Sequence, residues 1–264
     1  MPKVSVVIVT WNNEKDIEEC LDSLKEQTFK DFNVVVVDNK SKDATAKIVR
    51  EKYSDFTHLI ELPDNIYLTG GNNIGIEFSI KNYSPEFVMV LNPDTKCEAN
   101  LIEELLKPMS NPIVGAVGPK VRFYKNKNEG QINSAGLLYD GFRQAYDIGF
   151  LEKDEGQYNT QKEVFGVTGA CILYRTSMLE QIGYYWTKIK LYLDEVEMFI
   201  RAKKAGWKVM YQPSTTLHHK YMQSTDKIKT KRIEKIKRDA WLWIALRHYS
   251  LKAKFAMIKW WIGV

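Results

Sequence analysis

The sequence VSVVIVT at residues 4–10 decides the fold, because it is an almost unbroken run of apolar, mostly β-branched residues. Such a run is typical of a strand covered on both faces, as in a parallel sheet between two layers of helices. A helix is expected next, over residues 14–27, with Asn12 or Asn13 as its cap. The chain therefore begins with a strand–helix unit.

The alternation of strand and helix continues over the first 120 residues. The further elements predicted are strands at 33–37, 57–62 and 87–91, and helices at 44–50 after a Ser41 cap, after the Gly70–Gly71 turn, and at 100–107. This pattern predicts an α/β fold with a parallel, doubly wound sheet. Residues 121–162 show little periodicity, and we expect loops and irregular strands there that suit acceptor contacts.

The composition excludes several classes of protein. Hydrophobic residues make up 44% of the chain and aromatic residues 12%, which is enough to bury a core and excludes a disordered protein. The three cysteines lie far apart, so neither a disulfide framework nor a cysteine zinc site is expected, and a reducing cytosol fits. The N-terminal apolar run leads straight into polar residues, which indicates a buried strand and not a signal peptide.

Three predicted strand ends are polar, at residues 10–13, 38–43 and 92–95. In an open α/β sheet, ligands bind beyond the carboxyl ends of the strands. Asp38 could accept hydrogen bonds from a ribose or a base edge, or it could cap the next helix together with Ser41. Asp94 can ligate a hard cation that bridges two phosphates, although N-P-D-T is equally a turn with a helix cap.

Two common ways of binding phosphates are excluded, because the chain lacks the glycine-rich loops that they need. The turn after the first strand lacks the glycines of a Rossmann dinucleotide site, and the chain has no Walker A loop. A sugar nucleotidyltransferase would also need a glycine-rich loop at that turn. Gly70 and Gly71 allow a close backbone approach, and Asn72 and Asn73 offer amide groups, although a tight helix entry explains the same residues. A metal ion on Asp94 is then the candidate for holding a diphosphate.

A cluster of acids, L-D-E-V-E at residues 193–197, is followed by an apolar helical pattern that stops at Gly206. The acids then lie in the first turn, where the helix dipole favours carboxylates and is expected to hold their pKa low. That favourable placement would also explain the acids without any function. His218 and His219 follow further along the chain, and such a pair serves for structural hydrogen bonds more often than for ligation.

Seven motifs occur in order: SVVIVTWNN, VVVDNKSKDAT, NIYLTGGNNIG, LNPDT, GVTGACILYR, YLDEVEMFIRAKKAGW and LHHKYMQST. Together they resemble the family-2 glycosyltransferases of the type A fold, above all the rhamnosyltransferase-like members. The resemblance covers roughly residues 3–225. It implies a Rossmann-like nucleotide-sugar fold with a mixed central sheet, and a metal-dependent, inverting transfer of a sugar from a nucleotide-diphosphate donor.

The resemblance also implies binding roles. It assigns donor binding to Thr10, Trp11, Asn12, Asp38, Gly71, Asn73, Asn92 and Asp94. Asp94 takes the position of the last carboxylate in the family's D-x-D metal motif, and Mg²⁺ or Mn²⁺ is the implied cofactor. His219 takes the position of a histidine that reaches the metal or the diphosphate, with His218 as the alternative.

The catalytic base of the family's E-D motif corresponds to Glu195, with Asp194 before it and Glu197 two residues on. The sequence departs from the family pattern in three ways. The usual E-D-x-D is D-E-V-E here, a usual glycine is Tyr67, and a usual acid is Trp186. These departures keep a second hypothesis open: a catalytically silent nucleotide-sugar-binding scaffold at a membrane. The N-P-D form suggests a deoxythymidine-diphosphate rhamnose or another deoxysugar donor, with UDP-hexose as the alternative.

The predicted tail, residues 226–264, differs from the predicted catalytic domain, residues 1–225. The tail has eleven Lys or Arg residues and three acids, whereas the rest of the chain is mildly acidic. A basic, Trp-rich helix is typical of an interfacial anchor on anionic lipid, although its aromatics could instead dock on the catalytic domain. We therefore expect a cytoplasmic protein at the inner face of the cell membrane. It would act on a glycan or lipid-linked glycan in cell-surface polysaccharide synthesis, and no motif supports a nucleic-acid partner.

Overall fold

The computed structural model describes residues 1–221 and 230–262, without the side chains of residues 230–232. The strands are β1 (Val4–Thr10), β2 (Phe32–Asp38), β3 (Thr57–Glu61), β4 (Phe87–Leu91), β5 (Thr95–Cys97), β6 (Val114–Phe123), β7 (Ile132–Ser134), β8 (Leu137–Tyr139), β9 (Ala145–Asp147), β10 (Lys162–Val164), β11 (Cys171–Arg175) and β12 (Lys208–His219). The α-helices are α1 (Ile17–Lys25), α2 (Thr45–Lys52), α3 (Tyr67–Tyr83), α4 (Leu101–Leu106), α5 (Thr176–Ile182), α6 (Asp194–Lys204), α7 (Thr230–His248) and α8 (Leu251–Ile262).

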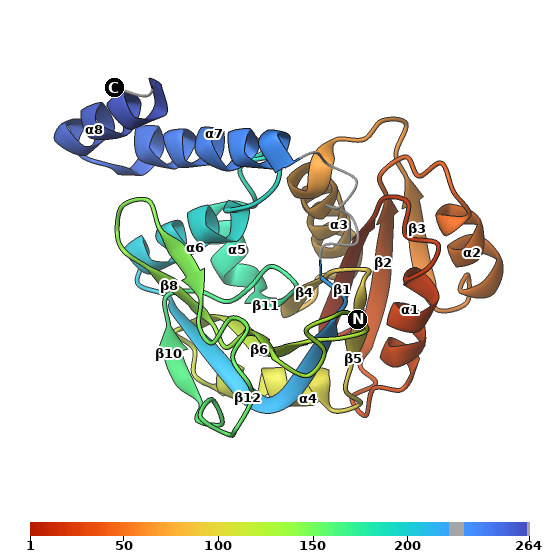
Figure 1. Ribbon diagram of the computed structural model, residues 1–264. Coiled ribbons are helices and arrows are strands. Elements are labelled where there is room, and N and C mark those ends of the chain that lie inside the picture. The colour runs from red at the N-terminus through yellow and green to blue at the C-terminus, as the bar shows by residue number, and fades with distance from the viewer. Residues whose placement is uncertain (222–229, 263–264) are drawn as a thin grey trace.

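A mixed central sheet organises these elements in the order β10-β12-β6-β11-β4-β1-β2-β3 (Figure 1). Strands β4, β1, β2 and β3 are parallel, as the alternation of strand and helix predicted. Strand β11 then runs antiparallel between β4 and β6. The doubly wound parallel arrangement therefore holds for the first half of the chain, and the whole sheet is mixed.

The sheet separates two cores, because successive side chains of a strand point to opposite faces. On one face Val6 and Ile8 of β1 pack with α1 and α4. On the other face Val7 belongs to a core shared with α3, α5 and α6. Glycines let α3 lie close to the sheet: a Cβ on Gly75 would lie only 2.3 Å from Val7 Cγ1, and one on Gly71 would lie 2.7 Å from Val9 Cγ1.

Three local predictions about helix starts were wrong. Neither Asn12 nor Asn13 caps α1, because the Asn13 side chain accepts a hydrogen bond from the Trp11 amide instead. Ser41 does not cap α2; its hydroxyl accepts a hydrogen bond from the Asn12 amide. The Gly70–Gly71 pair does not precede its helix either, because α3 already begins at Tyr67.

Helix α7 lies along the top of the molecule, above α5 and α6 and toward α3 (Figure 1). Its Trp241, Ile244 and Ala245 are buried in the same core as α6. The ring of Trp243 lies 6.2 Å from that of Trp186, in the loop before α6. This half of the tail is therefore docked on the catalytic domain. The predicted boundary between residues 225 and 226 lies outside the described residues, and no helix in the described part is long and apolar enough to cross a membrane.

Candidate active site

The carboxyl ends of β1 and β2 meet at one edge of the sheet, where Thr10 pairs with Asp38. The buried Thr10 hydroxyl donates a hydrogen bond of 3.0 Å to Asp38 Oδ1, and the Ser41 amide donates one of 2.9 Å to Oδ2. Asp38 therefore ties the two strand ends together and holds the turn that follows β2. Donor contacts by Thr10 and Asp38 remain predictions, and any such contact must share an oxygen that is already bonded.

The loops after β1 and β2 are also joined through Asn12. Its amide donates to Ser41 Oγ at 2.9 Å, and its side-chain oxygen accepts from the Lys42 amide at 2.7 Å. Asn12 has a positive φ of 57°, which asparagine tolerates better than most residues. These bonds hold the half-buried Trp11 at the edge of the sheet, where the predicted nucleotide site lies.

Asp94 follows β4 and lies beside His219, the last residue of β12. Strand β5 pairs with β12 so that Thr95 is opposite His219, which brings the N-P-D turn to the end of β12. Asp94 Oδ1 lies 3.3 Å from His219 Nε2, and both side chains are buried. On the other side of the ring, Nδ1 lies 3.1 Å from Asn133 Oδ1. A hydrogen bond from His219 to Asp94 requires a proton on Nε2, whereas a cation bound between the two would take the place of that proton and use the Nε2 lone pair.

This pair fits a divalent cation. A carboxylate oxygen and an imidazole nitrogen face one another, and the second ring nitrogen is held by an amide, as is usual for histidine ligands of metals. Burial by itself would raise the pKa of Asp94, but the charge and hydrogen bond of His219 outweigh it and lower the pKa. Among the described residues no group of three or more His, Cys, Asp or Glu side chains could hold a metal ion. A diphosphate and water could supply further ligands.

The alternative histidine, His218, points to the other face of β12. Its Nε2 lies 3.6 Å from Glu98 Oε1, and burial lowers its pKa. Alternate residues of a strand face opposite ways, so only one of the two histidines can approach Asp94. The structure brings His219 to Asp94 and not His218.

The acid cluster lies at the start of α6, next to the same edge of the sheet. A Cβ built on Gly169 would lie 4.0 Å from Glu195 Oε2. The next residue, Ala170, accepts a backbone hydrogen bond of 2.9 Å from Asn92 in the N-P-D turn. Glu195 and Asp94 are therefore placed by two neighbouring segments, one before β11 and one after β4. Donor binding by Asn92 stays a prediction; the contacts seen include this backbone bond and one from the Thr95 hydroxyl, which donates to the Asn92 carbonyl at 2.7 Å.

The electrostatics of Glu195 differ from the prediction. Burial raises the pKa of Glu195 well above its usual range, and the negative charges of Asp194 and Asp147 raise it further. Burial also raises the pKa of Asp194 to about 6, although its own backbone amide and its hydrogen bond with Glu195 oppose the rise. The expectation that the helix dipole holds the pKa of the base low was wrong, because burial and like charge outweigh the dipole.

Asp147 is a site residue that sequence reasoning missed. It ends β9, in the stretch that showed no periodicity, and burial raises its pKa to about 6. The Ser134 hydroxyl and the charges of His219 and Lys237 act against that rise. Its Oδ1 is buried without a hydrogen-bond partner. The charge of Asp147 raises the pKa of Glu195, and the charge of His219 lowers the pKa of Asp147.

Glu197 has a different role from its neighbours in the acid cluster. Its fully buried carboxylate lies 2.8 Å from Arg201 Nη2, 3.0 Å from Arg247 Nη1 and 2.9 Å from His248 Nε2. Arg247 and His248 belong to α7. Glu197 therefore fixes α7 to the helix that bears Glu195, and we expect it to have this structural role and no role in the reaction.

The loop before α6 is held from both sides. Asn73 of α3 donates to the Tyr185 carbonyl at 2.8 Å and accepts from its amide at 2.9 Å, so this residue, predicted to bind the sugar donor, positions the loop.

The departure from the family pattern at Trp186 has a structural explanation, because its ring packs against Trp243 and the Arg247 guanidinium of α7. Gly71 packs its helix on β1, as described above, and two side-chain oxygens of α3, Thr69 Oγ1 and Asn72 Oδ1, are buried without partners.

Comparison of the sequence with known proteins identifies the family and several relatives. The family model described as Glycosyl transferase family 2 matches residues 5–183, so the match ends before α6. The chain is similar to a low-salt glycan biosynthesis hexosyltransferase of Haloferax volcanii, with 28% identity over 205 residues, 76% of this chain and 62% of that protein. The chain thus spans less than two thirds of that relative. It is also similar to the N-acetylglucosaminyl-diphospho-decaprenol L-rhamnosyltransferase of Mycobacterium tuberculosis, with 24% identity over 267 residues, 92% of this chain and 84% of that protein.

Among solved structures, the chain is similar to a mannosyltransferase of Pyrobaculum calidifontis in complex with GDP-Man and Mn²⁺. The TM-score is 0.63 at 17% identity, over 98% of this chain and 70% of that chain. The likeness confirms the fold predicted from the sequence, which is the glycosyltransferase type A fold with a mixed central sheet.

Proposed function

Because this chain belongs to the family-2 glycosyltransferases, we propose that it is an inverting, metal-dependent enzyme of glycan biosynthesis. It transfers a sugar from a nucleotide-diphosphate donor to a hydroxyl of a glycan or lipid-linked glycan. The observation that supports this most is the placement of Glu195 beside Gly169, whose neighbour Ala170 binds the turn that bears Asp94. The proposed base and the proposed cation site would then share one edge of the sheet.

Glu195 is the base in this proposal. As the acceptor hydroxyl attacks the anomeric carbon, its proton passes to the Glu195 carboxylate, and the bond to the nucleoside diphosphate breaks on the opposite face. A single displacement inverts the anomeric configuration. General base catalysis of this kind is worth about 10²–10⁴-fold. The raised pKa of Glu195 makes it a stronger base once it is ionised.

Asp94 and His219 would hold Mg²⁺ or Mn²⁺. When bound there, the cation supplies Lewis-acid stabilisation of the negative charge on the leaving diphosphate. Asn133 keeps the His219 ring oriented toward Asp94. Since the described residues offer two protein ligands, we expect the cation to bind the protein more tightly when the nucleotide diphosphate is bound, and the reverse.

The donor proposed first is deoxythymidine-diphosphate rhamnose or a related deoxysugar nucleotide. The N-P-D form of the metal motif and the similarity to a mycobacterial L-rhamnosyltransferase support this choice. UDP-hexose is the alternative. Competition binding with TDP and UDP decides between them, because a strong preference for UDP contradicts the first choice.

We place the reaction at the inner face of the cell membrane, to which the enzyme would bind peripherally. The name of the mycobacterial relative includes a decaprenol-linked acceptor, and residues 226–264 have eleven basic and three acidic residues. Each Lys or Arg near an anionic leaflet contributes about 1 kcal/mol to binding. An acceptor anchored in lipid would explain why a catalytic domain needs such a tail.

A screen of nucleotide sugars for metal-dependent donor hydrolysis, combined with saturation-transfer binding, tests the proposal. We expect slow hydrolysis of one donor class that requires Mg²⁺ or Mn²⁺. Binding of a nucleotide sugar without turnover, in the presence of metal and of candidate acceptors, would instead support the catalytically silent scaffold. The D-E-V-E form of the acid motif is the reason to keep that comparison in the design.

A further inference from the structure

Helix α8 has one face turned toward α7 and one turned away from the protein. On the inner face Met257 is fully buried, and the Trp261 indole donates a hydrogen bond of 2.9 Å to Asp239 of α7. Ala253 and Lys254 are half-buried on the same side. Helix α8 is therefore packed against α7 along its length, and only its opposite face is accessible.

The accessible face contains an apolar stripe. The side chains of Leu251, Phe255, Ile258 and Ile262 are 75%, 67%, 37% and 57% exposed. Their spacing of four, three and four residues places them in one stripe only about 60° wide on a helix of 3.6 residues per turn. Isolated exposed apolar residues are normal, but a continuous stripe of large ones on one helix marks an interaction surface.

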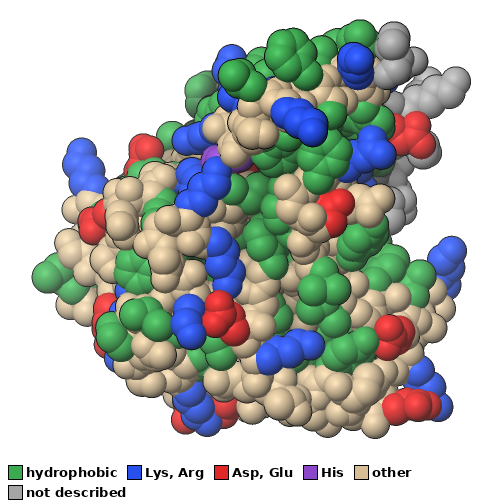
Figure 2. Space-filling view, turned by 90° about the vertical axis from the view of Figure 1, so that its left-hand side faces the viewer, with side chains coloured by type: hydrophobic (Ala, Val, Ile, Leu, Met, Phe, Trp, Pro, Cys, Tyr) green, Lys and Arg blue, Asp and Glu red, His purple; other side chains and the backbone are tan. Residues whose placement is uncertain are grey.

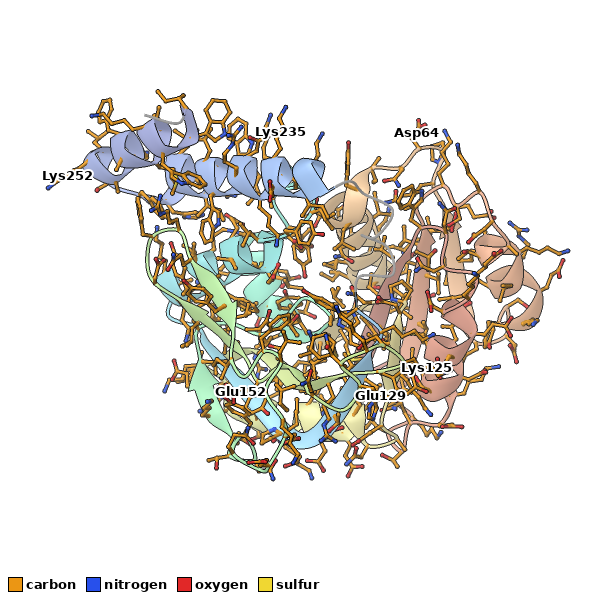
Figure 3. All side chains as sticks on the ribbon, viewed as in Figure 1. Asp64, Lys125, Glu129, Glu152, Lys235 and Lys252 are labelled. Carbon is orange, nitrogen blue, oxygen red and sulfur yellow. The ribbon has the colours of Figure 1, made fainter. Side chains whose placement is uncertain are left out.

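Lysines flank this stripe on both sides. By helical geometry Lys252 and Lys259 lie along one border, and Lys254 lies along the other. Figure 3 shows Lys252 pointing outward at the start of α8, next to the connection with α7, and Lys235 pointing outward from α7. Figure 2 shows hydrophobic side chains gathered at the top of the molecule, where Figure 1 places α8, with Lys and Arg side chains beside them. An apolar stripe with cationic borders is complementary to an anionic lipid surface, where acyl chains lie beneath negative headgroups.

We propose that the Leu251–Phe255–Ile258–Ile262 stripe of α8 is the surface by which the enzyme binds an anionic membrane. The inference deepens the proposed membrane association and rests on it. It also changes which residues are involved, because Trp241 and Trp243 of α7 are occupied by Tyr139 and Trp186 of the catalytic domain. Within the described part of the tail, residues 230–262, we assign membrane binding to α8.

Helix α7 connects this surface to the candidate active site, and its contacts with the rest of the protein fix its position. Arg247 and His248 bind the buried Glu197 of α6, and the Tyr249 hydroxyl lies 2.6 Å from that of Tyr139 on β8. Glu195 is on the same helix as Glu197. Binding through α8 would therefore hold the base at a fixed place relative to the lipid surface.

The test is sedimentation with vesicles of phosphatidylcholine alone and of phosphatidylcholine mixed with phosphatidylglycerol. Full-length protein should sediment with the mixed vesicles at low salt, and less at high salt because the charges are screened. The double variant Leu251→Glu, Phe255→Glu should bind them at least about tenfold more weakly. The matched control is Ile113→Glu just before β6, an isoleucine that is 46% exposed, which should bind as the wild type does.

A second variant separates the contribution of the lysine charges to vesicle binding from the contribution of the apolar stripe. Replacement of Lys252, Lys254 and Lys259 by Gln should remove most of the salt-sensitive part of binding. If the wild type binds the mixed vesicles and the double Glu variant binds equally well, the assignment to α8 is wrong. If the wild type instead forms dimers that the double variant dissociates, and ignores vesicles, the stripe is a contact between two copies. Metal-dependent donor hydrolysis, measured in the same variants without lipid, should stay unchanged, so that failure here is distinguishable from failure of the glycosyltransferase proposal.

Discussion

Replacing Glu197 by Gln removes one buried charge while it keeps the size of the side chain. The carboxylate is fully buried between Arg201, Arg247 and His248, with nitrogen–oxygen distances of 2.8 to 3.0 Å. Breaking a buried ion pair by removing one partner costs about 3–5 kcal/mol. Arg201 also donates to the carbonyls of residues 182, 183 and 184, so its charge stays partly satisfied. We therefore expect a loss at the lower end, about 3 kcal/mol of unfolding free energy.

The pH dependence of the same variant follows from the pKa of Glu197. Burial alone would raise this pKa, but the His248 and Arg201 partners outweigh burial and lower it. A carboxylate with a lowered folded-state pKa stabilises the protein above its unfolded-state pKa, and this contribution is lost as the pH falls through the folded-state value. The difference in stability between wild type and Glu197→Gln should therefore be largest near neutral pH and shrink in acid.

Urea unfolding followed by circular dichroism measures both effects. The matched control is Glu18→Gln, which removes an exposed partner of Lys52 at 2.8 Å and should cost less than about 1 kcal/mol. At a temperature where Glu197→Gln is folded, its donor turnover should stay within severalfold of wild type. A variant as stable as the wild type but without turnover would place Glu197 in the reaction and refute the structural role.

The other predictions concern the cation site and the base. Asp94→Asn should weaken Mg²⁺- or Mn²⁺-dependent binding of a nucleoside diphosphate without unfolding the domain, and unchanged metal dependence in a titration would remove Asp94 from this role. His219→Ala should show the same loss, whereas His218→Ala should not, because only His219 lies beside Asp94; equal losses in both would contradict the assignment. Asp147→Asn removes a negative charge that raises the pKa of Glu195. Since the ionised base is the active form, the limb of kcat/KM that rises with pH should move to lower pH, and an unmoved limb would separate Asp147 from the base.

The parallel half of the sheet could be predicted because its strands are buried on both faces. Residues 4–10, 33–37 and 87–91 are nearly continuous apolar runs, and each became a strand close to the predicted bounds. Irregular strands were expected between residues 121 and 162, but the bounds of the short strands between residues 132 and 164 could not be predicted, because they have three residues each and show no period of two. Helix starts were missed where asparagine and serine side chains bind neighbouring loops instead of their own helix.

The candidate site was predictable where a general rule points to it. Polar residues after buried strands do meet at one edge of the sheet, as shown by Thr10 and Asp38. Asp147 and Asn133 were not predictable, because their relation to Glu195 and His219 depends on how an irregular segment folds back. The dipole argument failed because a surface helix terminus contributes only about 0.3–1 kcal/mol, which burial and a neighbouring carboxylate exceed.

The tail shows the limit of composition as a guide. Its tryptophans and lysines predicted an interfacial helix over the whole segment, but burial divides it. Trp241 is 8% exposed and belongs to the core, whereas Phe255 is 67% exposed on the free face of α8. Only the structure distinguishes aromatics that dock on the catalytic domain from those available to a partner.

Comparison of Glu195→Gln with Asp194→Asn tests the central claim most directly. Turnover of the donor is measured in single-turnover and steady-state experiments, and donor affinity is measured separately by titration. The account predicts that Glu195→Gln keeps donor affinity and lowers kcat by at least about a hundredfold, whereas Asp194→Asn has a smaller effect. If Asp194→Asn abolishes turnover and Glu195→Gln does not, Glu195 is not the base and the proposed mechanism is wrong.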